Sequence, residues 1–340
     1  CYIQLLGLFS HEYFHTWNIK RLRPREFEQL DLQRENYTEL LWFFEGFTSY
    51  YDDLVLVRCG LIGVNDYLKL LTKTINQVLQ TPGRKVHTVA QASFEAWTKY
   101  YRPQPNTANT TVSYYTKGAL VAMCLDLSLR LMTIDPAPGG KKRVNSSKSL
   151  LPTVCLDDLM KRLWLSCPDG LMSEEDILKS LHDLTGIDFK KKLQDWVHTT
   201  KELPVSELLS DMGVAIKHEP AQWAQKLGLR IAETHPSGVV IKQVLNESIS
   251  QKAGLCDGDE WIGVEVITKK SDPHHLTWRI HKLDDIQLYV GSHRYINAII
   301  SRDKRILSIK MDLKELQDVK TLRLISTESD RLKSWLTPQS

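Results

Sequence analysis

The chain has 340 residues, of which 42% are hydrophobic and 25% are charged, a composition typical of a folded protein of about two domains. This composition excludes a disordered tail, a collagen-like rod and a small disulfide scaffold. The net charge of +3 is too near neutral to indicate nucleic acid or an anionic membrane as the main partner. No apolar run approaches the ~18 residues that a membrane span requires.

The six cysteines are scattered singly, and no pair has the C-x-x-C spacing of a zinc or redox site. The pattern does not match a disulfide framework, so it favours a reducing compartment such as the cytoplasm. A short apolar run, Ile3 to Phe9, precedes the first motif without the basic segment and cleavage site of a signal peptide. A functional motif so close to the first residue indicates that upstream sequence is missing, so a periplasmic location stays open.

The first 133 residues or so have the pattern of a helical unit. Apolar residues recur at spacings of three and four, and prolines separate the periodic stretches. A segment rich in Pro, Gly and Ser at about 135–149 is expected to be a flexible loop. The expected helices are Leu5–Trp17, Leu40–Val57, Tyr67–Leu79 and Ala119–Leu131.

Shorter helices are expected after this loop, and strands beyond Pro204. The helices are Leu156–Leu165, Ser173–Leu184, with Ser173 as N-cap and Asp176 at the third helical position, and Phe189–Val197. The strands are Val239–Ile241, Trp261–Ile267, Ile286–Val290 and Ile306–Met311. The sequence therefore predicts a multidomain α and β protein, with a mainly helical domain at 1–204, a β-rich domain at 205–320 and a C-terminal tail at 321–340.

The segment His11-Glu12-Tyr13-Phe14-His15 has the form H-E-x-x-H. Four helical residues turn through about 400°, so His11 and His15 lie on one helix face about 40° apart. Two imidazoles at this spacing can bind one zinc ion, and Glu12 beside them can accept a proton from a water molecule that zinc acidifies. An accidental match on an amphipathic helix is the alternative.

A third ligand is expected, because catalytic zinc usually has three protein ligands and one open position. Glu45 lies within an otherwise apolar helical stretch, where a lone carboxylate is costly unless it is paired or bound to metal. Glu39 is the competing candidate, on a more polar stretch. Pairing of Glu45 with an arginine is the other explanation.

H-E-x-x-H followed by the W-x-x-E-G-F segment at 42–47 resembles the gluzincin metallopeptidases related to aminopeptidase N. The longer run from Phe9 to Pro24, FSHEYFHTWNIKRLRP, resembles the PDZ-bearing glycyl aminopeptidase family of that group. The resemblance implies a thermolysin-like, mainly helical catalytic domain. It also implies one zinc ion bound by His11, His15 and Glu45, with Glu12 as the catalytic base.

Two further positions are candidates for the same site. Tyr115, in Tyr114–Ala119, is similar to the Y-x-K-G-A segment of the aminopeptidase N group, which implies that its hydroxyl stabilises the tetrahedral intermediate. Tyr114 is its rival. Asp52 lies about two turns after Glu45 and is expected to hydrogen-bond a ligand histidine. Asp53 or a plain surface acid pair is the alternative.

The β-rich domain resembles a PDZ domain of the bacterial protease type, most specifically at Ala253–Asp259, the segment AGLCDGD. The resemblance implies that Leu227, Gly228 and Leu229 form a loop whose N–H groups accept a terminal carboxylate. It also implies a groove helix near Asp284–Val290 and an extended peptide bound at the sheet edge. A β domain with a blocked groove is the alternative.

The leading hypothesis is a zinc-dependent metallopeptidase that acts on peptides or proteins. The family resemblance implies an aminopeptidase that releases small N-terminal residues such as Gly or Ala. The acidic residues with which the relatives bind the substrate amino group precede H-E-x-x-H and lie outside this sequence, which leaves a zinc endopeptidase open. A PDZ-type peptide-binding scaffold with a vestigial metal site is the third hypothesis.

Overall fold

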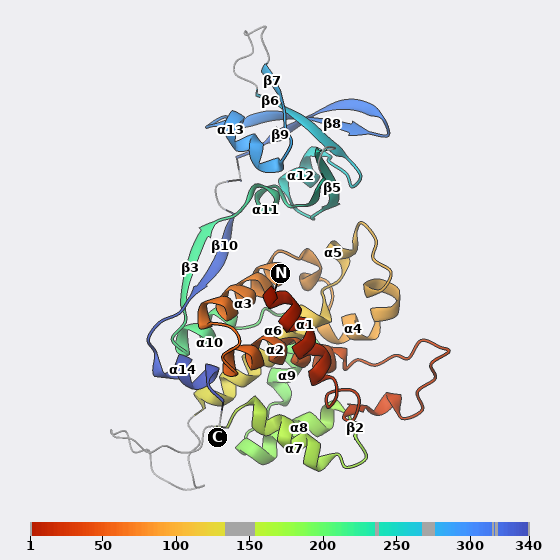
Figure 1. Cartoon of the computed structure of the whole chain (residues 1–340). Coiled ribbons are helices and arrows are strands. Elements are labelled where there is room, and N and C mark those ends of the chain that lie inside the picture. The colour runs from red at the N-terminus through yellow and green to blue at the C-terminus, as the bar shows by residue number, and fades with distance from the viewer. Residues whose placement is uncertain are drawn as a thin grey trace.

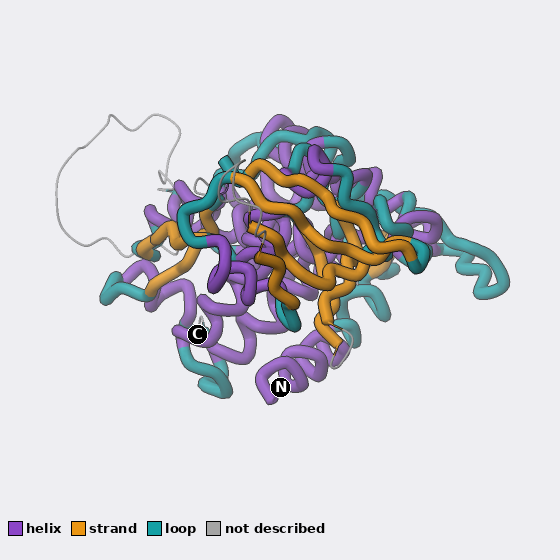
Figure 2. The backbone as a smooth tube through the Cα atoms, turned by 90° about the horizontal axis from the view of Figure 1, so that it is seen from above, coloured by secondary structure: helices purple, strands orange, loops and turns teal. Residues whose placement is uncertain are grey.

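The computed structural model of the chain describes residues 2–132, 154–234, 238–266, 276–314, 316 and 319–338. Most helices gather in one body, and a twisted sheet forms a second body beside it (Figure 1). The view from above shows the strands of the sheet lying across the helices (Figure 2). The protein is therefore a mixed α and β structure with a helical part and a β-rich part. The loop expected at about 135–149 lies outside the described residues.

The helices expected in the first 204 residues are confirmed, although several begin or end a few residues away from the predicted bounds. The capping box predicted for Ser173 and Asp176 is also present. None of the described helices is both long enough and apolar enough to cross a membrane. The helical body contains α1 (Tyr2–Phe14), α2 (Leu41–Arg58), α3 (Val64–Leu79), α4 (Val89–Phe94), a π-helical turn η3 (Ala96–Tyr100), α5 (Thr107–Thr110), α6 (Tyr114–Leu131), α7 (Leu156–Ser166), α8 (Glu174–Thr185), α9 (Lys190–Val197) and α10 (Val205–Asp211).

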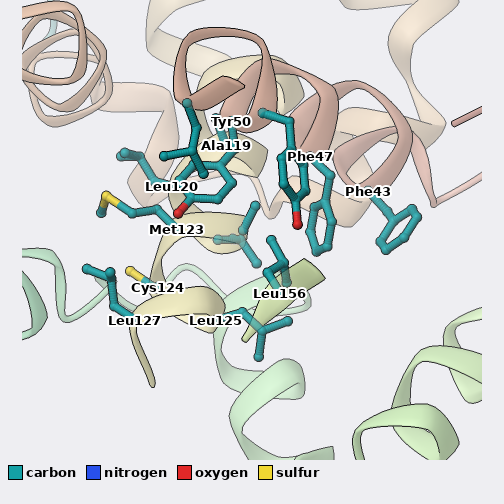
Figure 3. Packing of buried hydrophobic residues seen from close by; sticks show 14 of the residues in the cluster. Phe43, Phe47, Tyr50, Ala119, Leu120, Met123, Cys124, Leu125, Leu127 and Leu156 are labelled. Carbon is teal, nitrogen blue, oxygen red and sulfur yellow. The ribbon is translucent and has the colours of Figure 1, made fainter. Parts of the chain in front are cut away.

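Helices α2 and α6 form the centre of the helical body. Phe43 and Phe47 of α2 share one hydrophobic cluster with Leu120 and Met123 of α6, and all four side chains are inaccessible or nearly so (Figure 3). Burial of such large apolar side chains stabilises each by about 1.5–3 kcal/mol relative to exposure. The crossing of α2 and α6 is therefore the part of the fold on which any site on these helices depends.

A buried polar network joins this centre to neighbouring helices. Asp126 of α6 accepts hydrogen bonds from the Tyr50 hydroxyl at 2.6 Å and from Arg130 Nε at 2.9 Å. The indole N–H of Trp335 donates to the Tyr50 hydroxyl at 2.8 Å. Because buried charges are costly unless they are paired, this network fixes one arrangement of α2, α6 and the C-terminal helix.

The β-rich part is a six-stranded antiparallel sheet with its own hydrophobic cluster. Its strand order is β4-β5-β6-β8-β9, and β7 pairs with β6 beside this path. The strands are β4 (Leu229–Thr234), β5 (Gly238–Val244), β6 (Glu260–Val266), β7 (Leu276–Arg279), β8 (Tyr295–Arg302) and β9 (Arg305–Asp312), and short helices α11 (Trp223–Leu227), α12 (Ile249–Ala253) and α13 (Ile286–Val290) accompany them.

The strand predicted from the apolar run Ile286–Val290 is wrong, because this segment is helix α13. Ile286 and Val290 are four residues apart, so a helix buries both of them on one face. The carboxylate of Asp285 accepts the N–H groups of His281 and Lys282, which fixes the turn that leads into the helix. The helix implied near Asp284–Val290 by the PDZ resemblance matches this position.

The residues expected as a tail at 321–340 form ordered structure in their described part. Strand β10 (Lys320–Ile325) pairs antiparallel with β3 (Ala215–Pro220), and α14 (Asp330–Leu336) packs in the helical body (Figure 1). Trp335 is fully buried in the hydrophobic cluster of that body. The chain thus leaves the helical body along β3 and returns along β10, a long-range pairing that no local pattern predicts.

Candidate metal centre

Helix α1 lies against α2 through one of its faces. The Ser10 hydroxyl donates to the Asp52 carbonyl at 2.8 Å, and the Phe14 ring stacks on Tyr51 at 4.9 Å between centroids. The other face of α1 is open, with Tyr13 66% exposed. The contacts with α2 turn His11 and His15, which share one helix face, toward Glu45 and Asp52.

His11, His15 and Glu45 converge at one point. The Nε2 atoms of His11 and His15 lie 3.3 and 3.2 Å from the same carboxylate oxygen of Glu45. One ligand atom from each of the three side chains falls within 4.8 Å of the others, a spacing compatible with a shared metal ion. Among the described residues, no other group of three or more His, Cys, Asp and Glu side chains meets this condition.

The second ring nitrogen of each histidine is held by an oxygen atom. His11 Nδ1 lies 3.0 Å from an Asp52 carboxylate oxygen, and His15 Nδ1 lies 3.0 Å from the Asn18 carbonyl oxygen. Because a carbonyl oxygen only accepts hydrogen bonds, His15 Nδ1 carries the hydrogen, and its Nε2 can present a lone pair. Metal-binding histidines are typically oriented in this way. Of the two acids considered at this position, Asp52 is the one that contacts His11.

The charges around the histidines favour a cation at the point of convergence. Burial lowers the pKa of His11, but hydrogen bonds and charge from Asp52 and Glu45 outweigh it and raise the pKa to about 9. Burial raises the pKa of Glu45, but its contacts with both histidines lower the pKa to about 2. The same carboxylates that stabilise an imidazolium proton would stabilise a metal cation bound in its place. The residues present therefore fit a divalent metal.

A cavity of about 380 Å³ opens over these groups. Glu12 is exposed within its lining, next to the two histidines. Glu39, the competing ligand candidate, lies on the exposed segment before α2 and is not in the cluster. The lining consists of His11, Glu12, His15, Thr16, Ile19, Lys20, Glu45 and Tyr115.

Tyr115 and Tyr114 have different surroundings, although they are adjacent at the start of α6. Tyr115 lines the cavity, with its ring centroid 6.2 Å from that of His11, whereas Tyr114 is only 1% exposed in the core. Burial, followed by the charge of Glu45, raises the pKa of Tyr115, so its hydroxyl keeps its proton and can donate a hydrogen bond. Between the two tyrosines, Tyr115 is the one that a substrate in this cavity can reach.

The turn after α1 contains two residues that sequence reasoning did not identify. The Asn18 side-chain amide donates to the Phe44 carbonyl at 3.0 Å and to the Thr48 hydroxyl at 3.2 Å, which ties this turn to α2. Ile19 lines the cavity with φ of +104°, a strained value for a β-branched residue. An asparagine directly after a helix was an available signal, whereas nothing local indicates the conformation of Ile19.

The residues expected to form a carboxylate-binding loop have little access to solvent. Leu227 and Leu229 are buried at 0% and 4% exposure. Gly228 ends α11 with φ of +70°, and its N–H donates to the Gln225 carbonyl at 3.1 Å. That N–H therefore serves the end of α11, while the edge of β4 away from β5 has no strand partner among the described strands.

Comparison with known proteins gives one family and one solved structure to describe. Residues 4–121 match the model of a family described as M61 glycyl aminopeptidase. The chain is also similar to the crystal structure of an aminopeptidase N family protein from Idiomarina loihiensis, with 29% sequence identity and a TM-score of 0.82. That similarity covers 99% of this chain and 55% of the other, so the chain spans about half the length of the structure it matches. Comparison with curated proteins gives no match.

Proposed function

Because residues 4–121 belong to the M61 glycyl aminopeptidase family, we propose that this protein is a zinc-dependent aminopeptidase that releases small N-terminal residues such as Gly or Ala. The family and the similar solved structure support a peptidase acting on peptide substrates. The zinc ion, the exopeptidase activity and the preference for small residues are the parts that we propose.

The observation that carries the proposal is the convergence of three side chains from two helices. His11 and His15 would hold the metal through Nε2, and Glu45 would hold it through a carboxylate oxygen. Three protein ligands leave an open position, as in catalytic rather than structural zinc sites. Bound zinc would lower the pKa of a water molecule and polarise the carbonyl of the scissile peptide bond.

The protein's own residues then carry out the proton transfers and the orientation of the substrate. Glu12, exposed at the cavity, accepts the proton of the attacking water and delivers it to the leaving amine. The Tyr115 hydroxyl donates a hydrogen bond to the oxygen on which negative charge develops. Asp52 and the Asn18 carbonyl keep the two imidazoles in the orientation that directs Nε2 to the cavity.

The direct test combines metal analysis with hydrolysis of glycine and alanine anilides. We expect one zinc per chain, turnover that chelation abolishes and zinc restores, and retained zinc with almost no turnover in Glu12→Gln. Full activity of Glu12→Gln would contradict the role of this residue as base. Cleavage of N-terminally blocked peptides at rates matching the anilides would instead favour an endopeptidase.

We further propose that the β-rich part is a PDZ-like module at residues 205–320, following a thermolysin-like gluzincin catalytic domain at 1–204. Support comes from its separate hydrophobic cluster, the position of α13 and the strand edge of β4. Because the Gly228 N–H is already bonded, we expect any peptide to depend on the β4 edge rather than on this loop. A peptide-binding scaffold without catalysis would be favoured if the protein bound peptides but neither zinc nor anilide substrates.

A further inference from the structure

A group of exposed aromatic side chains lies beside the candidate metal centre. Its members are between 37% and 56% exposed, although side chains of this size are usually largely buried. They come from the segment that joins α4 to α6 and from the loop before α2. We call the group the aromatic strip, and it consists of Tyr37, Phe94, Trp97, Tyr100 and Tyr101.

The aromatic strip is continuous with the cavity over the metal centre. Tyr115, whose ring lies 6.2 Å from His11, is 5.3 Å from the ring of Tyr100. Tyr101 lies 5.5 Å from Tyr100, and Trp97 lies 5.5 Å from Tyr101. These steps lead outward from the metal centre along an exposed surface.

The strip is held in place by unusual backbone and side-chain contacts. Trp97 and Tyr100 belong to the π-helical turn η3, in which the Tyr101 N–H donates to the Ala96 carbonyl at 3.0 Å. Such turns are rare and occur frequently at functional sites. The Trp97 indole N–H donates to the Asn36 carbonyl at 2.9 Å, and this fixes the ring against the loop before α2.

The charged groups around the strip are paired with each other. Lys99 forms an ion pair with Glu95, and Arg102 approaches Glu35 at 3.7 Å. The strip therefore offers aromatic faces without a free charge of either sign. A surface of this kind recognises an uncharged apolar or aromatic group.

We propose that the aromatic strip binds a large apolar or aromatic side chain of the peptide substrate, a few residues away from the bond cleaved at the metal centre. The inference rests on the proposed function and specifies its substrate class, which is peptides of several residues rather than single-residue amides. An extended peptide advances about 3.3 Å per residue, so the three ring-to-ring steps beyond Tyr115 accommodate roughly two to four residues.

The test measures peptide binding to the Glu12→Gln protein, so that its readout does not depend on turnover. Isothermal titration compares Gly-Ala-Ala-Ala-Ala with the three peptides that carry Phe at the third, fourth or fifth position. We expect one Phe peptide to bind about tenfold more tightly than the all-alanine peptide. Trp97→Ala and Tyr101→Ala should bring this ratio close to one, whereas Trp97→Phe should retain most of it.

Trp164→Ala is the matched control, because Trp164 is a similarly exposed tryptophan, at 43%, on α7. It should leave the Phe preference unchanged, and circular dichroism should confirm that each variant is folded. Equal affinity for all four peptides, or a preference that survives both alanine variants, would overturn the proposal. Equal peptide affinities together with a Trp97-dependent dimer in sedimentation would assign the strip to a second copy and would overturn it as well.

Anilide hydrolysis by the unmodified protein separates this inference from the proposed function. Turnover of glycine anilide with equal peptide affinities contradicts only the role of the aromatic strip. A Trp97-dependent preference without any anilide turnover contradicts the aminopeptidase and supports the strip as a peptide-binding surface.

Discussion

Gly46 of α2 and Gly118 of α6 touch each other where the two central helices cross. A methyl group added at Gly46 would lie 2.5 Å from Gly118 Cα, and one added at Gly118 would lie 2.5 Å from the Trp42 carbonyl oxygen. Gly46 directly follows Glu45, and Gly118 is three residues after Tyr115. The close crossing therefore sets the distance between the candidate metal ligand and the candidate oxyanion donor.

Gly118→Ala should destabilise the protein by about 1–3 kcal/mol, because the extra methyl forces two buried backbones apart. We also expect anilide turnover to fall more than zinc affinity does, since Tyr115 moves relative to the ligands. Urea unfolding and zinc titration measure these effects. Gly63→Ala is the control, because its added methyl would make only an ordinary contact with Asp66. Equal stability of the two variants would contradict the close crossing.

Asp52→Asn should weaken zinc binding by about 10–100-fold, because the charge that supports the His11 imidazole is lost. Competition with a chromophoric chelator gives the zinc affinity, and thermal unfolding of the metal-free protein shows whether the fold is retained. Asp66→Asn, on α3, controls for the loss of one negative charge from the molecule. Unchanged zinc affinity in Asp52→Asn would show that this carboxylate does not support a metal ligand.

Much of the metal centre could be predicted from local sequence, because an i, i+4 pair on one helix fixes the relative positions of His11 and His15. Glu45 stood out as a carboxylate in an apolar helix, but only the packing of α1 on α2 brings it within 3.3 Å of the histidines. The pairing of β3 with β10 joins residues about a hundred positions apart, so no local periodicity contains it. Ile286–Val290 shows the limit of short apolar runs, which suit a buried strand and a buried helix equally well.

His198 should stabilise the protein in a pH-dependent way through Glu174, whose carboxylate lies 2.8 Å from its Nε2. The hydrogen bond with Glu174 raises the pKa of His198 above 6.5 despite burial. A raised pKa of a base means stabilisation that is complete below about pH 6.5 and is lost as the pH rises through the folded-state value. His198→Gln should therefore cost about 1 kcal/mol near pH 5.5 and little at pH 9, as measured by urea unfolding.

The exposed His218 provides the control for this titration. His218→Gln should change the unfolding free energy by less than about 0.5 kcal/mol at either pH. A His198→Gln penalty that stayed constant from pH 5.5 to pH 9 would show that packing, rather than the ion pair, accounts for the contribution of His198.

Ile19 should reverse the usual ranking of alanine over glycine. Its φ of +104° is costly for any side chain with a Cβ and is accessible to glycine, while its N–H donates to the Leu22 carbonyl at 2.8 Å in either variant. Ile19→Gly should therefore be more stable than Ile19→Ala by about 1 kcal/mol. At Ile75, inside α3 and 1% exposed, the order should be the normal one, with alanine more stable by a similar amount. Thermal unfolding of the four variants decides the matter, and the same order at both positions would mean that the turn after α1 is unstrained and that the cavity wall is not held by stored backbone energy.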